Sequence, residues 1–249
     1  MQRLRIRYTK TGRVRFVSAR DMTSVWERAL RRAELPIAYS EGFSPHPKIS
    51  FPDALPVGYA STGEYAELTF AAPIDPGRGL GRLSTSLPPG MDVMTFVTVP
   101  DGARKLAGFL EATLWELEYA AVGDPDELVS ELDRRVAAFM AADHVEVIRH
   151  RAKGDVTVDV RPAVLAFASS LRGDGPQRTP VLRAVLRNDG PTIRPADLAT
   201  ALATFGDEPV AEPRLYVRVA QGHPTEDGVR EALTQQVEPL VLARHAELA

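Results

Sequence analysis

Arg-Leu-Arg-Ile-Arg-Tyr, at residues 3–8, alternates charged and apolar side chains, and Met-Thr-Ser-Val-Trp-Glu-Arg-Ala-Leu-Arg-Arg-Ala follows at residues 22–33. The first stretch has the period of two that is typical of a strand with one buried face. The second spaces its apolar residues at i, i+3, i+4, i+7, i+8 and i+11, which indicates an amphipathic helix. The chain is therefore expected to open with a strand and a helix.

The residues between these two stretches predict a hairpin and a capped helix start. Residues 9–12 have turn composition, and Arg13–Val17 resumes the alternation, so a second strand is expected there. Ser18, with Asp21 three residues later, resembles a helix-capping arrangement, because a short side-chain oxygen accepts from free backbone N–H groups. Pro36 is expected to end the helix.

The elements that follow predict the fold class. Strands are expected at 48–51, 64–70 and 91–99, with a weak helix at 76–86, giving the order β-(β)-α-β-β-α-β. This order is typical of a ferredoxin-like sandwich, an antiparallel sheet with two helices on one face.

A similar succession of strands and helices is expected after a linker at 100–103 and a short helix at 104–110. Strands are expected at 112–121, 145–150, 155–161, 164–170, 180–187 and 215–220, and helices at 125–142, 195–205 and 226–248. We therefore predict an α+β protein with two ferredoxin-like α/β sandwich units in tandem, each with an antiparallel sheet. The expected domains are 1–100, 101–225 and a helical tail at 226–249.

Composition excludes several classes of protein. The 249 residues include no cysteine, which excludes disulfides, thiolate zinc sites and iron–sulfur clusters held by this chain. No apolar run approaches the ~18–20 residues that span a bilayer, and the N-terminus has no signal-peptide core. A cytoplasmic protein with no membrane partner is expected.

The charge of −3 hides an uneven distribution. Residues 1–50 contain 11 Lys and Arg against 4 Asp and Glu, so the rest of the chain is strongly acidic. A basic end on an acidic body is expected where one face meets phosphates or an acidic partner. The alternative is a solvated strand and helix surface that happens to use arginine.

The loop Tyr39-Ser-Glu-Gly-Phe-Ser-Pro-His-Pro-Lys-Ile-Ser-Phe51 has the most distinctive chemistry. Two prolines stiffen it and so reduce the entropy lost on binding. Lys48 and nearby arginines could neutralise phosphates, and Phe43 or Tyr39 could stack on an unpaired base. The alternative is that both aromatic side chains fill the core. The candidate RNA- or partner-binding residues are Arg5, Arg7, Arg15, Arg20, Arg28, Arg31, Arg32, Tyr39, Phe43, Ser44, His46 and Lys48.

Histidine chemistry is a weaker signal. His46 could act as a general acid or base, but the sequence identifies no partner group for it. His144 and His150 would share a strand face about 20 Å apart, too far to share a metal. No metal site and no cofactor are predicted.

The stretch from about residue 3 to residue 70 also resembles a known family. The carrying residues are Arg13-Val-Arg-Phe-Val-Ser18, Asp21, Glu27–Pro36, Ala38–Phe51, Leu55-Pro-Val-Gly58, Ser61 and Glu64-Tyr65. They are similar to the radical-SAM-linked (radical-SAM-associated) protein family, a bacterial domain of unknown function found fused to, or encoded near, a radical SAM enzyme. Ala19 departs from the family, which often has histidine there. The resemblance implies a cytoplasmic accessory protein with a radical SAM enzyme as partner.

Three functions remain open at this point. The first is an accessory protein that binds RNA or presents a substrate and is not itself catalytic. The second is a protein–protein adaptor that docks a radical SAM enzyme through the same loop. The third is a metal-independent endoribonuclease that uses His46 with Lys48 or Tyr39.

Overall fold

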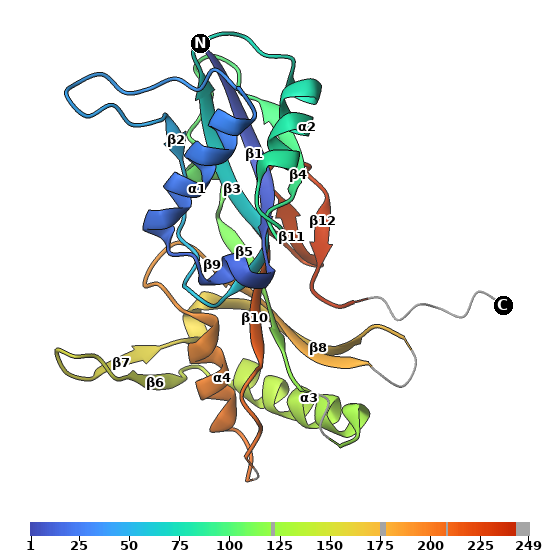
Figure 1. The fold of residues 1–249 in the computed structure, drawn as a ribbon. Helices are drawn as coiled ribbons and strands as arrows, with labels where there is room; N and C mark the ends of the chain where they lie inside the picture. The colour runs from blue at the N-terminus through green and yellow to red at the C-terminus, as the bar shows by residue number, and fades with distance from the viewer. Residues whose placement is uncertain (121–122, 175–177, 208, 243–249) are drawn as a thin grey trace. The chain divides into compact units, whose positions relative to one another are not determined.

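The structure is a computed structural model that describes residues 1–120, 123–174, 178–207 and 209–242 (Figure 1). The chain divides into two compact units. Unit 1 holds Met1–Phe109 together with Ala232–Gln235, and unit 2 holds Leu110–Glu231 and the described residues from Gln236 on. The sequence had indicated a boundary at residue 100.

Unit 1 carries four strands and two α-helices among its described residues. Its elements are β1 (Gln2–Lys10), η1 (Gly12–Phe16), α1 (Ala19–Arg32), β2 (Ile49–Ser50), β3 (Ala60–Phe70), α2 (Pro76–Ser86), β4 (Val93–Thr98) and η2 (Leu106–Phe109). The strands lie in the order β4-β1-β3-β2, and each neighbouring pair is antiparallel. β1 is therefore a central strand, with β3 on one side and β4 on the other.

One face of this sheet and both helices form a single core. Leu4, Ile6 and Tyr8 alternate along β1 and point to this face, and they cluster with Trp26 of α1 and Leu83 of α2. The shared cluster places α1 and α2 on the same side of the sheet. Fully burying a large apolar side chain contributes about 1.5–3 kcal/mol, so the period-two pattern of β1 determines which face the helices cover.

The structure corrects the predicted hairpin at the start of the chain. Arg13–Val17 does not form a strand; Gly12–Phe16 is a 3₁₀ helix, η1. β1 already pairs with β3 and β4 along both edges, so no edge is open for a strand that follows it directly. A strand at residues 13–17 would therefore have no free edge of β1 to pair with.

The expected start of α1 is confirmed. The Ser18 side chain accepts a hydrogen bond from the Asp21 backbone N–H at 3.2 Å and donates one to the Asp21 carboxylate at 2.7 Å. Such a cap stabilises a helix by about 1 kcal/mol. The helix ends at Arg32, and Glu34 then adopts a left-handed backbone with φ of 50°, before Pro36 is reached.

Unit 2 has an analogous strand order built from different residues. Its elements are β5 (Ala112–Glu118), α3 (Pro125–Ala141), β6 (Glu146–Arg149), β7 (Val156–Asp159), η3 (Arg161–Ala163), β8 (Val164–Arg172), β9 (Thr179–Arg187), α4 (Pro195–Ala203), β10 (Leu215–Thr225), β11 (Gly228–Glu231) and β12 (Val237–Pro239). Four strands lie in the order β10-β5-β9-β8, again antiparallel. β6 and β7 form a separate two-stranded hairpin. Phe139 of α3 packs edge-to-face on Phe167 of β8 and on Phe205 after α4.

The predicted helix at 226–248 is wrong over its described first part. β10 runs to Thr225, past the expected end at 220, and continues through a turn into β11, which pairs with β12. Gly228 makes this possible, because its φ of 150° suits glycine and an added Cβ would lie 2.1 Å from the Glu238 carbonyl oxygen. Residues 243–249 of the prediction lie outside the described residues.

The broad class is therefore an α+β protein with antiparallel strand pairing. Within the described ranges, no helix is long and apolar enough to cross a membrane.

Candidate functional site

The loop between α1 and β2 is exposed and internally braced. The Ser40 N–H donates to the His46 carbonyl at 2.8 Å, and the His46 N–H donates back to Ser40 Oγ at 3.0 Å. Tyr39 and Pro47 form a bridge at its base. Two main-chain donors are thereby satisfied within the loop itself, so it keeps its shape without packing on a core.

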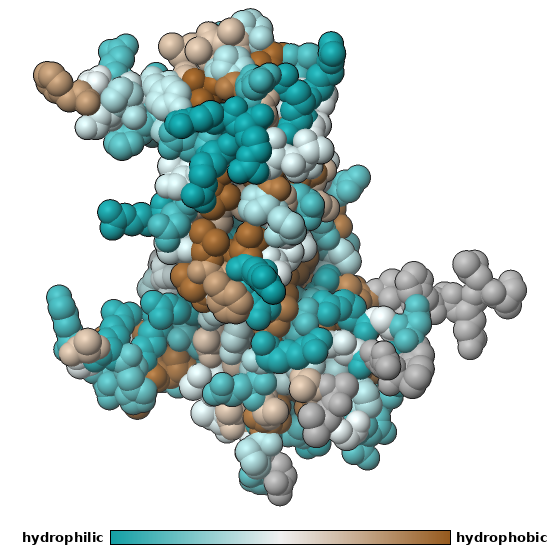
Figure 2. Space-filling view, in the orientation of Figure 1, coloured by the Kyte–Doolittle hydropathy of each residue, from teal (hydrophilic) through white to brown (hydrophobic). Residues whose placement is uncertain are grey.

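The tip of this loop presents an aromatic side chain to solvent. Gly42 has a φ of 118°, which lets the chain turn, and Phe43 beside it is fully exposed. Tyr39 at the base is 41% exposed. Figure 1 shows the loop projecting beside α1 and β2, and in Figure 2 its end is apolar. The alternative that Phe43 fills the core is therefore wrong. Ser44, His46 and Lys48 are also exposed.

The outer surface of α1 carries the exposed cations. Met22, Trp26, Ala29 and Leu30 form its buried stripe. Arg20, Arg28, Arg31 and Arg32 are exposed on the remaining surface. Arg31 forms an i,i+4 ion pair with Glu27 at 2.9 Å, and Arg32 approaches the Ser86 carbonyl at 3.4 Å. We call these four arginines and the loop at 39–48 the loop–helix surface.

Arg5 and Arg7 do not belong to an exposed surface. They lie on the face of β1 opposite the helices, 7% and 8% exposed. Arg5 Nε pairs with Glu67 Oε2 at 2.9 Å, and its guanidinium lies over the Phe109 ring; Arg7 Nε donates to the Thr62 carbonyl at 2.9 Å. The alternation that buries Leu4 and Ile6 against α1 sends these arginines to the other side of the sheet. They support the fold of unit 1.

Arg15 is neither exposed like the arginines of α1 nor buried like Arg5 and Arg7. Its guanidinium lies 4.7 Å from the centroid of the Phe16 ring, and the side chain is half-buried on η1. Ten of the twelve candidates are thus exposed or half-buried: four on α1, five on the loop and Arg15 on η1.

The charge asymmetry persists when the chain is divided into its two units. Residues 1–109 contain 15 Lys and Arg against 10 Asp and Glu, whereas the remaining residues contain 15 against 23. Unit 1 is thus cationic and unit 2 anionic. Cationic surfaces attract phosphates over a Debye length of about 8–10 Å, so an anionic partner would meet unit 1 first.

Three of the other histidines make exposed pairs with carboxylates. His144 Nδ1 lies 2.8 Å from Asp159, His150 Nδ1 lies 2.9 Å from Asp155, and His223 Nδ1 lies 2.8 Å from Glu111. The hydrogen bond to Asp159 and that residue's charge raise the pKa of His144 above its usual value. Across the residues that the structure describes, no three metal-ligand side chains cluster.

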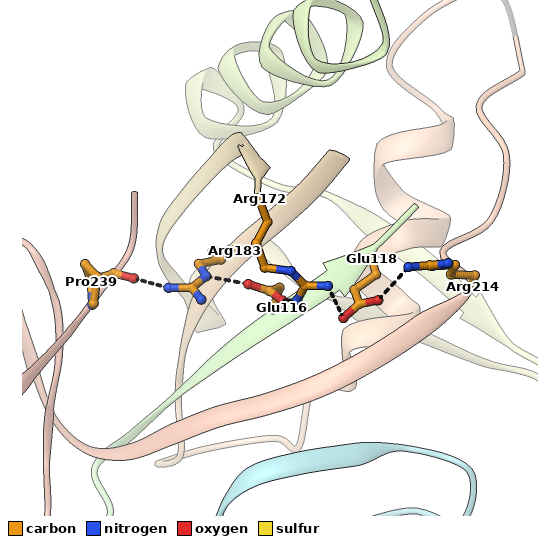
Figure 3. Close-up of polar contacts among 6 residues, drawn as sticks. All are labelled: Glu116, Glu118, Arg172, Arg183, Arg214 and Pro239. Atoms are coloured by element: carbon orange, nitrogen blue, oxygen red, sulfur yellow. Dashed lines mark hydrogen bonds and ion pairs between the residues drawn. The ribbon is translucent and has the colours of Figure 1, made fainter. Parts of the chain in front are cut away.

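A cluster of ion pairs belongs to the fold of unit 2 (Figure 3). Arg183 Nε pairs with Glu116 Oε2 at 2.8 Å, and its Nη1 donates to the Pro239 carbonyl at 2.7 Å. Arg172 bonds both Glu116 and Glu118, and Arg214 reaches Glu118 at 3.3 Å. These contacts join β5, β8, β9, β12 and the start of β10, so the cluster connects the strands.

Sequence reasoning missed a cavity in unit 1. It has a volume of about 230 Å³ and is lined by Tyr8, Lys10, Ala19, Met22, Phe51, Asp53, Ala54, Leu55 and Glu64. Lys10 and Glu64 are 3% and 4% exposed. The signal was present in the sequence, because the alternation of β1 that buries Ile6 and Tyr8 also turns Lys10 inward. A charged residue at an inward position indicates a site or a buried pair.

The chain matches the family described as an uncharacterized protein conserved in bacteria (DUF2344) over residues 3–195. None of the curated proteins matches it. Since the match covers most of the chain, including all of the loop–helix surface, the protein belongs to this family.

Proposed function

We propose that this protein is a cytoplasmic, non-catalytic accessory protein that binds RNA through the loop–helix surface and presents it to a radical SAM enzyme. The observation that carries the proposal is the fully exposed Phe43 on a braced loop that follows the arginine-bearing helix α1. Aromatic side chains stack on unpaired bases while neighbouring cations neutralise phosphates, and each base stacked contributes about 1–3 kcal/mol.

The radical SAM partner is supported by the resemblance of residues 13–67 and by composition. A radical SAM enzyme holds its cluster through cysteine thiolates, and this chain has none, so such chemistry would belong to a partner.

We further propose that both units are ferredoxin-like. The orders β4-β1-β3-β2 and β10-β5-β9-β8 support this, because β1 lies between β4 and β3 just as β5 lies between β10 and β9. One helix lies between β1 and β2 and one between β3 and β4, and likewise α3 follows β5 and α4 precedes β10. The β6–β7 hairpin would then be an insertion in unit 2.

The experiment is a salt titration of RNA binding. Fluorescence anisotropy of a labelled single-stranded RNA is expected to show binding at low ionic strength that weakens as salt rises. Arg28→Ala combined with Arg31→Ala should weaken binding and flatten the salt slope by about 1.4, since each phosphate neutralised on a single strand contributes about 0.7 to the slope. Arg78→Ala, an exposed arginine on α2, is the control. Absence of salt-sensitive binding would refute the proposal.

A second candidate function is supported by the same exposed ring. A fully exposed phenylalanine suits a hydrophobic pocket on a protein partner, so the chain could act as an adaptor that docks the radical SAM enzyme directly. Co-purification that is lost in Phe43→Ala, and that survives ribonuclease treatment, would favour the adaptor over the RNA-binding protein.

A further inference from the structure

Unit 2 contains an open cleft beside its separate hairpin. The cleft has a volume of about 860 Å³, which lies within the range of roughly 300–1,000 Å³ typical of pockets for small molecules. It is lined by β6 and β7, by η3, and by the end of β9 with the loop that leads to α4. Figure 1 shows the hairpin extending beside α4. All of the lining residues lie between 149 and 193, so the cleft is a feature of unit 2 alone.

Three arginines line this cleft, and one of them is held firmly. Arg149 belongs to β6, Arg151 to the turn after it, and Arg187 ends β9. Arg149 Nε donates to Asp197 Oδ1 at 3.0 Å, and its Nη2 donates to the Thr192 carbonyl at 2.7 Å. Asp197 is itself buried in α4. A guanidinium that is fixed in advance loses less side-chain entropy when it binds a ligand.

Donor groups of all three arginines remain available. Arg187 Nε pairs with Asp189 Oδ1 at 2.9 Å, which leaves both of its Nη groups. Among the residues that the structure describes, those two groups, Arg149 Nη1 and the whole side chain of Arg151 have no hydrogen-bond or ion-pair partner. Guanidinium groups match the oxygens of a phosphate or a carboxylate and often bind them in bidentate fashion.

The two carboxylates of the cleft are already engaged. Asp189 pairs with Arg187. Asp159 accepts from the Val145 N–H at 3.0 Å and from the Arg161 N–H at 3.1 Å, and its other oxygen lies 2.8 Å from His144 Nδ1.

The charge of the cleft therefore favours an anion. Asp197 balances Arg149 and Asp189 balances Arg187, whereas Arg151 has no compensating carboxylate within the described ranges. The cleft is thus a cationic site in a unit that is anionic as a whole. An anionic ligand that binds to unit 2 would be attracted to this place.

The remaining wall of the cleft is mainly aliphatic. It includes Val156, Val158, Pro162, Pro191 and Ile193. An apolar body of the ligand would lie against these side chains while the arginines bind its charged end. A phosphate monoester has a charge of about −1.5 to −2 and three strong acceptor oxygens, whereas a carboxylate has two oxygens. Three guanidinium groups therefore match a phosphate better than a carboxylate.

We propose that this cleft binds a small phosphate monoester, with Arg149, Arg151 and Arg187 at the phosphate and the aliphatic wall at the organic body. The site goes beyond the proposed RNA binding and does not depend on it. The chain from residue 110 on contains 15 Lys and Arg against 23 Asp and Glu, so an RNA polyanion would meet a repulsion that a small ligand largely avoids. A small molecule is therefore a better occupant than an RNA chain.

Phenyl phosphate is the probe, because it joins a phosphate monoester to an apolar ring. Amide NMR spectra of the full chain should show shifts at Gly190 and Thr192, which line the cleft, and none at Gly42 of the loop–helix surface. Benzoate should bind about tenfold more weakly, since it offers the arginines fewer acceptors and less charge. Inorganic phosphate should also bind more weakly, because it lacks the apolar body. Unmoved signals of Gly190 and Thr192, or equal binding of all three anions, would overturn the inference.

Two of the arginines allow variants that keep the fold. Arg151 and Arg187 are exposed, and the Arg187–Asp189 pair lies at the surface, where such pairs contribute little to stability. Arg151→Ala combined with Arg187→Ala should weaken phenyl phosphate binding by about tenfold or more, because charge-assisted hydrogen bonds are lost. Lys153→Ala is the matched control, since Lys153 is exposed on the same turn but does not line the cleft. Equal binding by the double variant and the control would contradict the inference.

A 5′-phosphorylated RNA ends in the same chemical group. Two single-stranded RNAs of one sequence, with a 5′-phosphate or a 5′-hydroxyl, are therefore compared by anisotropy. They are expected to bind equally, because the cleft takes a small molecule. Tighter binding of the phosphorylated strand that is lost in the double variant would overturn the assignment to a small molecule.

Discussion

Arg183 places a guanidinium inside unit 2, and its partners decide how costly its removal is. It is 7% exposed and bonded to Glu116, itself 2% exposed, and to the Pro239 carbonyl. Removing one partner of a buried pair costs about 3–5 kcal/mol where the other charge is left uncompensated. Glu116 would keep its ion pair with Arg172, so the cost here is that of the lost charged hydrogen bonds.

We therefore expect Arg183→Ala to lower the free energy of unfolding by about 1.5–3 kcal/mol, measured by urea denaturation. Arg178→Ala is the matched control, because Arg178 pairs with Asp126 at the surface, where such pairs contribute about 0–1 kcal/mol. Equal losses in the two variants would show that burial does not set the energy of the Glu116 pair.

The His144–Asp159 pair predicts a pH dependence. Burial of Asp159 opposes its ionisation, but the hydrogen bonds from His144, Val145 and Arg161 outweigh it and lower its pKa. The pKa of His144 is raised, with the hydrogen bond to Asp159 as the largest cause. The stabilisation from His144 is complete below its unfolded pKa and is lost as pH rises through the raised one. The stabilisation from Asp159 is present above its unfolded pKa and is lost as pH falls through the lowered one.

We expect the pair to stabilise the β6–β7 hairpin most at a pH above the unfolded pKa of Asp159 and below the unfolded pKa of His144. NMR titration should give His144 a pKa above the usual value for a histidine. In Asp159→Asn, which keeps an oxygen for the Val145 N–H, the pKa of His144 should fall toward its usual value of about 6.5. An unchanged titration of His144 in this variant would contradict the assigned cause.

The turn before β4 depends on the absence of a side chain. Gly90 has a φ of 92°, and a Cβ there would lie 2.5 Å from the Thr11 carbonyl oxygen. Its own carbonyl accepts from the Thr11 N–H at 2.9 Å, which ties this turn to the end of β1. The position therefore combines a left-handed backbone with a close approach between two segments.

A left-handed backbone alone costs about 1–2 kcal/mol for a residue with a side chain. Gly90→Ala should lower the free energy of unfolding by more than this, because the added Cβ also approaches the Thr11 carbonyl. Gly102→Ala is the control, because Gly102 has a φ of 74° and open space around its Cβ position. Thermal unfolding should show the larger drop in melting temperature for Gly90→Ala. Equal drops would mean that the turn relaxes away from Thr11 at little cost.

Local sequence patterns predicted the helices and strands better than they predicted the candidate functional site. The stripe and cap of α1 and the alternation of β1 were readable, because each depends on neighbours within a few residues. The strands after Thr225 and the 3₁₀ turn at Gly12–Phe16 depend on which edges distant strands occupy, and no local signal carries that. The burial of Arg5 and the cavity beside Lys10 follow from the face that the helices cover. The alternation of β1 indicates which face the helices cover, but it does not indicate that Glu67 and Phe109 cover Arg5 on the opposite face.

At the scale of the whole chain, net charge and local charge make opposite predictions for RNA binding. A chain of net charge −3 should be repelled by a polyanion, whereas the excess of cations within residues 1–109 should attract it. Because screening limits attraction to about 8–10 Å, the cations that touch the RNA decide its affinity.

A pair of charge-matched triple variants tests this directly. Arg20→Ala, Arg28→Ala and Arg31→Ala together remove three exposed cations of α1, and Arg151→Ala, Lys153→Ala and Arg230→Ala remove three exposed cations of unit 2. Both lower the net charge equally, but only the first should weaken single-stranded RNA binding, by about tenfold or more at low salt, and reduce the salt slope. Anisotropy titrations at several salt concentrations measure both effects. If the two triple variants weaken binding equally, the affinity for RNA depends on the total charge of the protein and not on the arginines of α1.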